Sequence, residues 1–394
     1  MDFGALALVV AAGLLGPVLA TTRRFRAPIV VGELLAGIAI GHTGLRWVDG
    51  SSHPLADLGE IGFALLMLIA GTHLPLRAPG LRQAAARGAG AAVLAFLVAV
   101  PVALVVRAFT PFHETGLLVL LLATSSSAIV MPILADGGPA SGAGLVAIAW
   151  VAIADVATVV GIPLVMASDH VAKVIAGSVL VLALSAVLYV LIRAADRRNT
   201  IDRQEALALQ HGWGLRLRLS LLALFVLAWV ATSFGTSVLI AGFSLGMVLA
   251  LVGEPESLAR ELIGVGEGFF VPIFFVTLGA RLDVRALFTD PENLVFLVVL
   301  LAGIVLVHVV VALLTRRGWP TGLVASAQLG VPSAIASLGL ANGTIRPGQG
   351  AAIVTSAIAS VGLASFGAAR LGRSDTSVDR LDPSVGPPME HGPA

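Results

Sequence analysis

The stretch LLAGIAIG at residues 34–41 returns as LIAGFSLG at residues 239–246, 205 positions further along the chain. Two more pairs follow in the same order, at offsets of 208 and 206: GTHLPLRA at 71–78 with GARLDVRA at 279–286, and Ser127-Ala128-Ile129 with Ser333-Ala334-Ile335. Three ordered matches at nearly one offset indicate an internal repeat. The alternative is that small residues recur because they let membrane helices pack closely.

Composition places this repeat in a membrane. Of the 394 residues, 57% are hydrophobic and 12% are charged, whereas a soluble domain carries about 25% charged residues. The 44 Gly and 20 Pro agree with this, because both are frequent in membrane helices. An ordinary soluble protein is therefore excluded.

The chain divides into apolar segments, most of them close to the roughly 20 residues that a membrane-spanning helix needs. We count thirteen: 3–20, 28–42, 58–75, 88–108, 115–135, 142–166, 171–192, 217–233, 235–252, 266–282, 293–314, 321–341 and 349–369.

The repeat offset carries the second segment onto the ninth and the fifth onto the twelfth, which is a shift of seven segments. Because seven is odd, the second copy enters the membrane from the opposite side. The predicted fold is an all-α polytopic membrane protein with two inverted-topology six-helix repeats, segments 1–6 and 8–13, joined by segment 7. Inverted repeats are typical of secondary transporters.

Positive charge predicts the orientation, because Lys and Arg gather in cytoplasmic loops. With the N-terminus outside, 18 of the 24 Lys and Arg fall on the inner side. Losing or adding one segment in the middle would remove this bias. We therefore expect a multi-pass protein of the cytoplasmic membrane of a prokaryote, N-terminus outside and C-terminus inside. The polar, Pro-rich residues 371–394 are expected to form a disordered cytoplasmic tail.

Two corresponding segments carry Pro and small hydroxyl residues deep in the span: residues 123–132 read ATSSSAIVMP and residues 330–335 read GVPSAI. Pro interrupts a helix, and unwound backbone is tolerated only where protein or a water-filled cavity satisfies it. Such a matched pair predicts crossed discontinuous helices and a mid-membrane binding site. We expect freed carbonyls and the hydroxyls of Thr124, Ser125 and Ser126 to bind a cation. An ordinary Pro kink remains the alternative for each helix.

Asp155 lies near the middle of the sixth segment, with no basic residue within a turn of it. A central Asp costs about 2.5–3.5 kcal/mol on insertion scales, and such a residue indicates function by default. We predict that Asp155 binds a proton and the transported metal cation in alternation. The alternative is a permanently protonated carboxyl group that only hydrogen-bonds a neighbouring helix.

Three further residues are weaker candidates, as modulators of transport. His308 lies mid-span in the eleventh segment and can change charge near physiological pH, or else is a neutral side chain with one hydrogen bond. Glu33 lies in the second segment, where a structural or coupling role is possible, and Ser333 follows the Pro of the twelfth segment.

Several classes of function find no support. The net charge of +1 offers no basic patch for nucleic acid. The absence of cysteine excludes thiol chemistry and thiolate metal sites. The sequence contains no P-loop, no dinucleotide fingerprint in a βαβ context and no H-E-x-x-H motif. We expect no enzyme and no cofactor, only transported Na+ or K+ and H+.

At these residues the chain resembles the monovalent cation:proton antiporter-2 family, which includes NapA-like and Kef-like sodium or potassium/proton exchangers. The resemblance covers residues 1–370. It rests on residues 28–37 (PIVVGELLAG), residues 66–71 (LMLIAG), the run from Ser125 to Pro132, Asp155, residues 240–242 (IAG) and residues 268–276 (GFFVPIFFV).

The resemblance implies a homodimer whose subunits have two moving parts. Residues 1–87 and 215–290 would form the scaffold and dimerisation domain, and residues 88–168 and 291–370 the ion-transporting core. Residues 169–214 would be a linker helix and a cytoplasmic loop. The core would carry the ion by an elevator-like shift, with Asp155 as the ion-binding carboxylate.

Two departures from the family pattern matter. Members usually have Asp, Asn or Gln before the key Asp, where this chain has Ala154, and many have Lys where this chain has His308. Because the Asp–Lys pair is associated with electrogenic exchange, we expect electroneutral one-for-one exchange here. The chain shows no match to the C-terminal nucleotide-binding domain of Kef systems, so we expect no nucleotide gating.

The sequence thus predicts a secondary active antiporter that exchanges Na+ or K+ for protons by alternating access. Its expected partners are these ions, membrane lipid and a second copy of the chain. The alternatives are a sodium-coupled organic-anion symporter of the bile-acid-transporter-like fold, or a cation channel.

Overall fold

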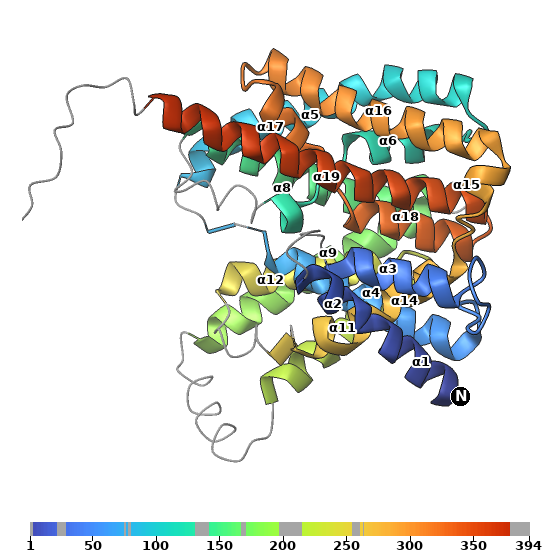
Figure 1. The fold of residues 1–394 in the computed structure, drawn as a ribbon. Helices are drawn as coiled ribbons and strands as arrows, with labels where there is room; N and C mark the ends of the chain where they lie inside the picture. Colours follow the sequence, from blue (N-terminus) through green and yellow to red (C-terminus); the bar gives the residue numbers. More distant parts are fainter. Residues whose placement is uncertain are drawn as a thin grey trace, which may run out of the picture.

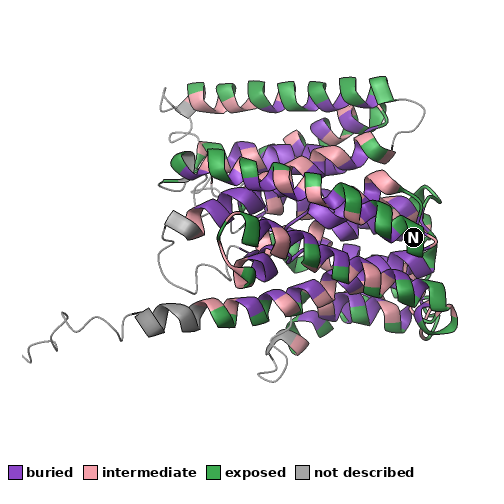
Figure 2. Cartoon of the chain, turned by 90° about the horizontal axis from the view of Figure 1, so that it is seen from above, coloured by how far each residue is buried: buried purple, intermediate pink, exposed green. Residues whose placement is uncertain are grey.

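The computed structural model describes residues 3–21, 29–74, 76–77, 80–130, 142–166, 171–196, 215–253, 261–262 and 264–378. Within these ranges the chain is a bundle of helices without strands (Figure 1). Buried residues fill the middle of the bundle and exposed residues cover its outer helices (Figure 2). Many of the exposed side chains are large and apolar, such as Leu104, Val190 and Trp229, as expected for helices that face lipid.

The helices in chain order are α1 (Phe3–Gly13), α2 (Leu15–Thr21), α3 (Ile29–Ile40), α4 (His53–Thr72), α5 (Leu81–Phe109), α6 (Thr115–Ala123), α8 (Gly142–Met166), α9 (Val171–Asp196), α11 (Leu215–Ser233), α12 (Val238–Val252), the π-helix η1 (Gly266–Phe270), α14 (Val271–Arg281), α15 (Ala286–Thr289), α16 (Pro291–Leu314), α17 (Trp319–Ala325), α18 (Gly330–Ala341) and α19 (Pro347–Val378).

Each of the thirteen predicted segments coincides with a helix or an interrupted helix, so the all-α polytopic fold class is confirmed. Seven described helices are long and apolar enough to cross a membrane, or eight if α17 and α18, bent by 41°, form one span. Shorter apolar helices lie at Phe3–Leu19, Ile29–Ile40, Thr115–Val130 and Val238–Val252. The count of thirteen crossings stays a prediction.

The helices form two groups (Figure 1). The first group consists of α1, α2, α3, α4, α11, α12 and α14, and the second of α5, α6, α8, α16, α17, α18 and α19. Packing is extensive inside each group, whereas the groups meet chiefly where α18 touches α4 and where α8 touches α12. The division into a scaffold and an ion-transporting core stays a prediction.

Two helix pairs of the first group pack so closely that they require glycine. A Cβ atom on Gly37 of α3 would collide with the carbonyl group of Val276 in α14, and one on Gly242 of α12 with the carbonyl group of Ala64 in α4. Gly37 and Gly242 are corresponding positions of the sequence repeat. In both pairs the second segment of one copy packs on the third segment of the other.

Some element boundaries differ from those expected. The first segment is divided at Leu14 into α1 and α2, the third begins already at His53, and the tenth opens with the π-helix η1. Helix α19 continues to Val378, so the tail expected from residue 371 is helical in its first part. Residues 379–394 lie outside the described ranges, as do Met131, Pro132 and the loop residues 197–214.

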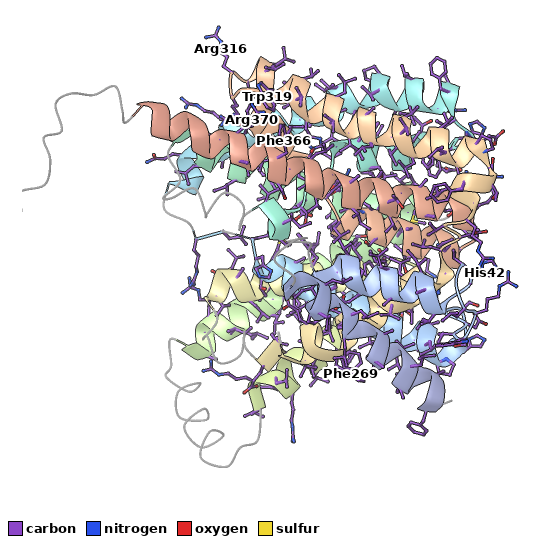
Figure 3. The ribbon with its side chains drawn as sticks, viewed as in Figure 1. His42, Phe269, Arg316, Trp319, Phe366 and Arg370 are labelled. Atoms are coloured by element: carbon purple, nitrogen blue, oxygen red, sulfur yellow. The ribbon has the colours of Figure 1, made fainter. Side chains whose placement is uncertain are left out.

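The bundle has two distinct ends. Arg316, Trp319 and Arg370 gather at one end, and His42 lies at the opposite end (Figure 3). The guanidinium group of Arg370 lies 4.9 Å from the ring centre of Phe366. Helix α1 begins at the His42 end, whereas α19 finishes at the arginine end (Figures 1 and 3). An odd number of crossings places the two termini at opposite ends in this way, and the N-out, C-in orientation stays a prediction.

Candidate ion-binding site

Two helices of the second group are interrupted, as the sequence predicts. Helix α6 ends at Ala123, residues 124–126 are extended, and the helix resumes at Ser127. Helix α17 ends at Ala325, and α18 begins at Gly330. The interruptions precede the prolines that suggested them: Pro332 occupies the first turn of α18, where a missing N–H group costs nothing.

The two interruptions touch each other. The backbone N–H group of Ser126 donates to the carbonyl oxygen of Ala327 over 2.9 Å. The hydroxyl group of Ser125 donates to the carbonyl oxygen of Ala325 over 2.7 Å. Each interruption therefore satisfies backbone groups that the other leaves without a helical partner, and this mutual pairing is why unwound chain can persist at this depth.

Asp155 of α8 lies directly beside this crossing. Its Oδ2 atom accepts hydrogen bonds from the backbone N–H group of Ser127 at 2.9 Å and from the Ser127 hydroxyl group at 2.5 Å. Ser127 begins the second half of the interrupted helix, and the N-terminal end of a helix favours a negative charge. Among the described residues the second oxygen, Oδ1, receives no hydrogen bond, and the side chain keeps 7% of its surface exposed.

His308 of α16 joins the same cluster. Its Nδ1 atom lies 2.8 Å from the carbonyl oxygen of Ile304, and its Nε2 atom lies 3.1 Å from the hydroxyl oxygen of Ser125. The ring stacks on Trp150 with centroids 5.7 Å apart. Because a carbonyl only accepts, Nδ1 carries a hydrogen atom.

The hydrogen bonds of the Ser125 hydroxyl group depend on the protonation state of His308. This hydroxyl group has one hydrogen, which it donates to Ala325. In a neutral His308 ring the Nε2 atom is an acceptor and competes with the Ala325 carbonyl oxygen for that hydrogen. A ring protonated on both nitrogens donates to Ile304 and to Ser125 and leaves the Ser125 hydrogen for Ala325. The state of His308 is thus coupled to the hydrogen bond that ties the two interruptions together.

Thr124 is held by a partner that the sequence did not single out. The Oγ1 atoms of Thr124 and Thr158 lie 3.0 Å apart. The Thr158 hydroxyl group donates to the carbonyl oxygens of Ala154 and Asp155, at 2.8 and 2.9 Å, so Thr124 is the donor between the two threonines. This contact fixes α6 against α8 one turn from the Asp155 side chain.

The structure brings Asp155, Thr124, Ser125, Ser126 and His308 together at the crossing of the two interruptions. That they bind an ion stays a prediction. Ser333 is buried on α18 near the crossing, with no partner for its hydroxyl oxygen among the described residues. Glu33 is also buried, but on α3 of the first group, away from these contacts.

Sequence reasoning missed Ser127 and Thr158 as site residues. Ser127 stood out only as part of the repeat, and its role depends on where the helix resumes. The spacing of Thr158, three residues after Asp155, places the two near each other on α8 and could have pointed to it.

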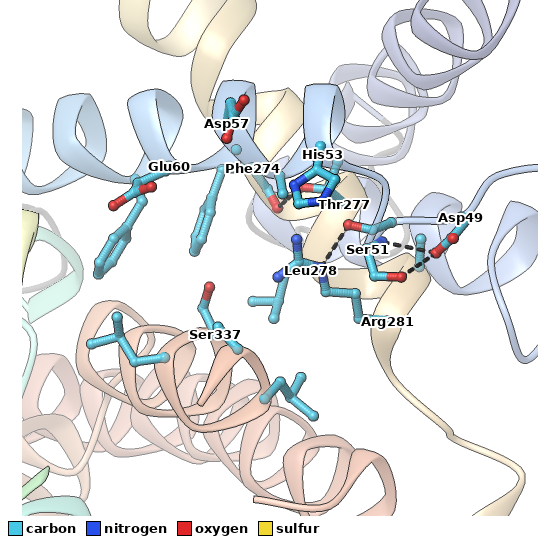
Figure 4. A pocket seen from close by; sticks show the side chains of 18 of the residues that line it. Asp49, Ser51, His53, Asp57, Glu60, Phe274, Thr277, Leu278, Arg281 and Ser337 are labelled. Carbon is cyan, nitrogen blue, oxygen red and sulfur yellow. Dashed lines mark hydrogen bonds between the residues drawn. The ribbon is translucent and has the colours of Figure 1, made fainter. Parts of the chain in front are cut away.

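A cavity of about 810 Å³ opens between the two helix groups (Figure 4). Asp57 and Glu60 of α4 and Arg281 of α14 line one side, and Ser337 of α18 faces them from the other (Figure 4). Asp155 is not one of its lining residues. Within the described ranges no three His, Cys, Asp or Glu side chains gather as a metal site.

Comparison with known proteins decides the family. The sequence profile of the family "Sodium/hydrogen exchanger, transmembrane" matches residues 9–372. The chain belongs to this family. The resemblance to cation:proton antiporters is thereby confirmed, and the chain is a multi-pass membrane transporter by family.

Individual relatives agree with this assignment. The chain is 25% identical over 382 residues to "Putative Na(+)/H(+) antiporter YjbQ" of Bacillus subtilis (strain 168), covering 90% of this chain and 61% of that protein. It is 28% identical over 278 residues to "Glutathione-regulated potassium-efflux system protein KefC" of Klebsiella pneumoniae (strain 342), covering 68% and 44%. The chain thus spans less than two thirds of the length of these two relatives.

The fold is that of a solved antiporter. The structure of the sodium proton antiporter MjNhaP1 from Methanocaldococcus jannaschii matches with a TM-score of 0.63 at 18% sequence identity. The match covers 94% of this chain and 98% of the solved one. At this identity the likeness establishes the fold alone.

Proposed function

We propose that this exchanger is a secondary active antiporter that moves Na+ or K+ against H+, with Asp155 binding cation and proton in competition. One observation carries the proposal: the Asp155 carboxyl group is held by Ser127 at the point where two interrupted helices cross. The names of the two relatives, a Na+/H+ antiporter and a potassium-efflux protein, support exchange and leave both cations open.

Competition at one carboxyl group is sufficient for coupling. Oδ2 is occupied by the two donors of Ser127, and Oδ1 is open to a proton or a cation. A proton on Oδ1 removes the charge that attracts the cation, and a bound cation repels the proton. If the protein exposes Asp155 to the opposite side of the membrane only when Asp155 carries a cation or a proton, each cation is exchanged for one proton.

Alternating access needs two parts that move relative to each other. The two helix groups are suited to this, since their mutual contacts are few and a cavity lies between them. In this proposal the first group is the scaffold and forms the homodimer, while the second group carries Asp155 across the membrane. The cavity is then the path from one side, because its Ser337 lies one turn from Ser333.

His308 is proposed as a positioning residue. It holds the Ser125 hydroxyl group, which in turn joins the two interruptions. With a histidine in place of the family's lysine, no permanently charged side chain balances Asp155, so that exchange is electroneutral.

The test uses everted membrane vesicles and a pH-sensitive dye, with Na+, K+ and Li+ added in turn. Wild-type protein should dequench the dye with at least one cation, and Asp155→Asn should abolish the response. Glu292→Gln, an exposed acid-to-amide change in the first turn of α16, should respond as wild type. Exchange by Asp155→Asn at the wild-type rate would refute the proposal.

The same vesicles separate the alternatives. A channel would pass cation current without proton counterflow. A symporter would take up Na+ only in the presence of an organic anion.

A further inference from the structure

Gln328 lies in the interruption between α17 and α18 and has 1% of its surface exposed. Among the described residues neither its Oε1 nor its Nε2 atom has a hydrogen-bond partner. Buried side-chain amides are nearly always paired, because an unpaired one loses its hydration without compensation. Gln328 is therefore a buried amide group whose hydrogen-bonding atoms are unused within the described residues.

A second buried glutamine shows the ordinary behaviour. Gln349 of α19 accepts a hydrogen bond from the backbone N–H group of Arg346 at 3.0 Å and donates one to the carbonyl oxygen of Pro111 at 3.4 Å. Its amide group thus joins two loops. The Gln328 amide group joins nothing, although it is more deeply buried.

The backbone fixes Gln328 at the crossing. The peptide group between Ala327 and Gln328 is anchored on both sides: its carbonyl oxygen accepts from Ser126, and its N–H group donates to the Ser360 hydroxyl oxygen at 3.3 Å. Ser126 is followed by Ser127, which holds Asp155. Only a short run of bonded groups therefore separates the Gln328 backbone from the Asp155 carboxyl group.

Several other oxygen atoms at the crossing already make hydrogen bonds. The carbonyl oxygens of Ala325 and Ala327 accept hydrogen bonds from the opposite interruption. The hydroxyl groups of Thr124 and Ser125 are held by Thr158 and His308. A cation that sheds its water needs several oxygen ligands, and the carbonyl oxygen of an unpaired amide is available without breaking any of these bonds.

We infer that the side-chain carbonyl oxygen of Gln328 is a ligand of the transported monovalent cation, supplied by the α17–α18 half opposite Asp155. The inference rests on the proposed function, since it concerns the same ion. A neutral oxygen ligand adds no charge to the site, so Gln328 affects how tightly and how selectively the cation binds and leaves the cation-to-proton ratio unchanged.

The experiment measures exchange kinetics in proteoliposomes at fixed pH. Gln328→Met keeps the length of the side chain and removes the amide, and Gln328→Asn keeps the amide and shortens its reach. For Gln328→Met we expect the apparent KM for the cation to rise about tenfold, equivalent to about 1.4 kcal/mol, with kcat within about twofold of wild type. The KM of Gln328→Asn should lie between the KM of wild type and that of Gln328→Met.

Gln349→Met is the matched control. It removes a paired, buried amide away from the crossing, and we expect it to lower the thermal unfolding midpoint and leave KM unchanged. A Gln328→Met protein with wild-type KM would overturn the inference, as would a KM change that Gln349→Met reproduces. If Gln328→Met does not accumulate, Gln328→Asn decides alone: a KM equal to that of wild type overturns the inference.

The outcome is separable from that of the proposed function. If Asp155→Asn abolishes exchange while the KM of Gln328→Met is unchanged, only the inference about Gln328 fails. If Asp155→Asn exchanges as wild type does, the site itself is misplaced and both fail.

Discussion

At the scale of the residue, the proposed chemistry depends on how the carboxyl group of Asp155 is held. Asp155 and its neighbours Thr124, Ser125 and His308 could be predicted because polar residues are rare and costly in apolar segments. Ser127 could not be ranked above Ser125 or Ser126, because three consecutive serines differ only in where the helix resumes. Gln328 carried a signal that was overlooked: it is an amide side chain within an apolar segment.

Ser127→Ala tests the hold on Asp155. The change removes the hydroxyl donor to Oδ2 and keeps the backbone donor. Hydrogen bonds to charged groups contribute about 1.5–3 kcal/mol, and losing one destabilises the charged carboxylate that accepts the cation. We expect the KM for the cation to rise about tenfold or more at fixed pH.

Ser178→Ala is the control for this variant. Ser178 is a buried serine of α9 whose hydroxyl oxygen lies 3.4 Å from that of Thr236, so its loss should leave KM as in wild type. An unaltered KM in Ser127→Ala would show that Ser127 does not act on the ion.

At the scale of the element, the positions of helices followed from the sequence more reliably than their interruptions. Long apolar runs have one solution in a membrane, since a helix satisfies its own backbone. The interruptions were expected at proline, yet α17 ends at Ala325, well before Pro332. Their exact place is decided by bonds across the crossing, such as Ser126 to Ala327, which join residues about 200 positions apart.

Close helix contacts give a prediction about stability. In Gly242→Ala the added methyl group meets the carbonyl group of Ala64, and such overpacking costs about 1–3 kcal/mol. Gly90→Ala places the same methyl group on α5 in open space, where alanine favours the helix by up to about 1 kcal/mol.

Thermal unfolding in detergent measures both changes. Gly242→Ala should unfold at a lower temperature than wild type, and Gly90→Ala at the same or a higher one. Equal midpoints for the two variants would contradict the close packing of α12 on α4.

The loop between α3 and α4 gives a prediction about pH. The hydroxyl and backbone N–H groups of Ser51 donate to Asp49, and these bonds, with a smaller contribution from Arg281, lower the pKa of Asp49 below its usual value. Because the folded pKa is the lower one, the stabilisation is complete above the unfolded pKa of about 3.9 and is lost as pH falls through the folded pKa.

Asp49→Asn removes this stabilisation. Near neutral pH the free energy of unfolding of the variant should be lower than that of wild type by no more than about 1 kcal/mol, because the group is exposed. Its unfolding midpoint should be slightly lower there, and the midpoints of the two proteins should converge in acid. If the difference between the two unfolding midpoints grew as pH falls, it would contradict a lowered pKa for Asp49.

At the scale of the whole molecule, the repeat was the strongest guide. It predicted two matched interruptions, and the structure has two that touch. The structure adds that α3 packs on α14 and α12 on α4, a pairing across the two copies that the sequence analysis did not anticipate. Sequence could not give the cavity between the helix groups, because its walls combine distant parts of the chain: the α3–α4 loop with α4, the start of α12, α14, α18 and the residues that follow α18.

Charge balance predicts the electrical behaviour of the whole exchanger. In the proposed mechanism Asp155 is the titrating carboxyl group of the crossing, and His308 stands where the resemblance leads us to expect a lysine in many relatives. On that proposal one cation moves against one proton, and no net charge crosses. The rate of exchange in proteoliposomes should not change when a membrane potential is imposed, whereas a potential-dependent rate would show that a further charge moves.

The most direct measurement of competition at Asp155 is proton release on cation binding by the purified protein in weakly buffered detergent solution. Addition of the transported cation should release protons from wild type at a pH where Asp155 is protonated before the cation binds, and Asp155→Asn should release none. Proton release of equal size from both proteins, or cation binding by wild type without any release at any pH, would contradict competition at this carboxyl group.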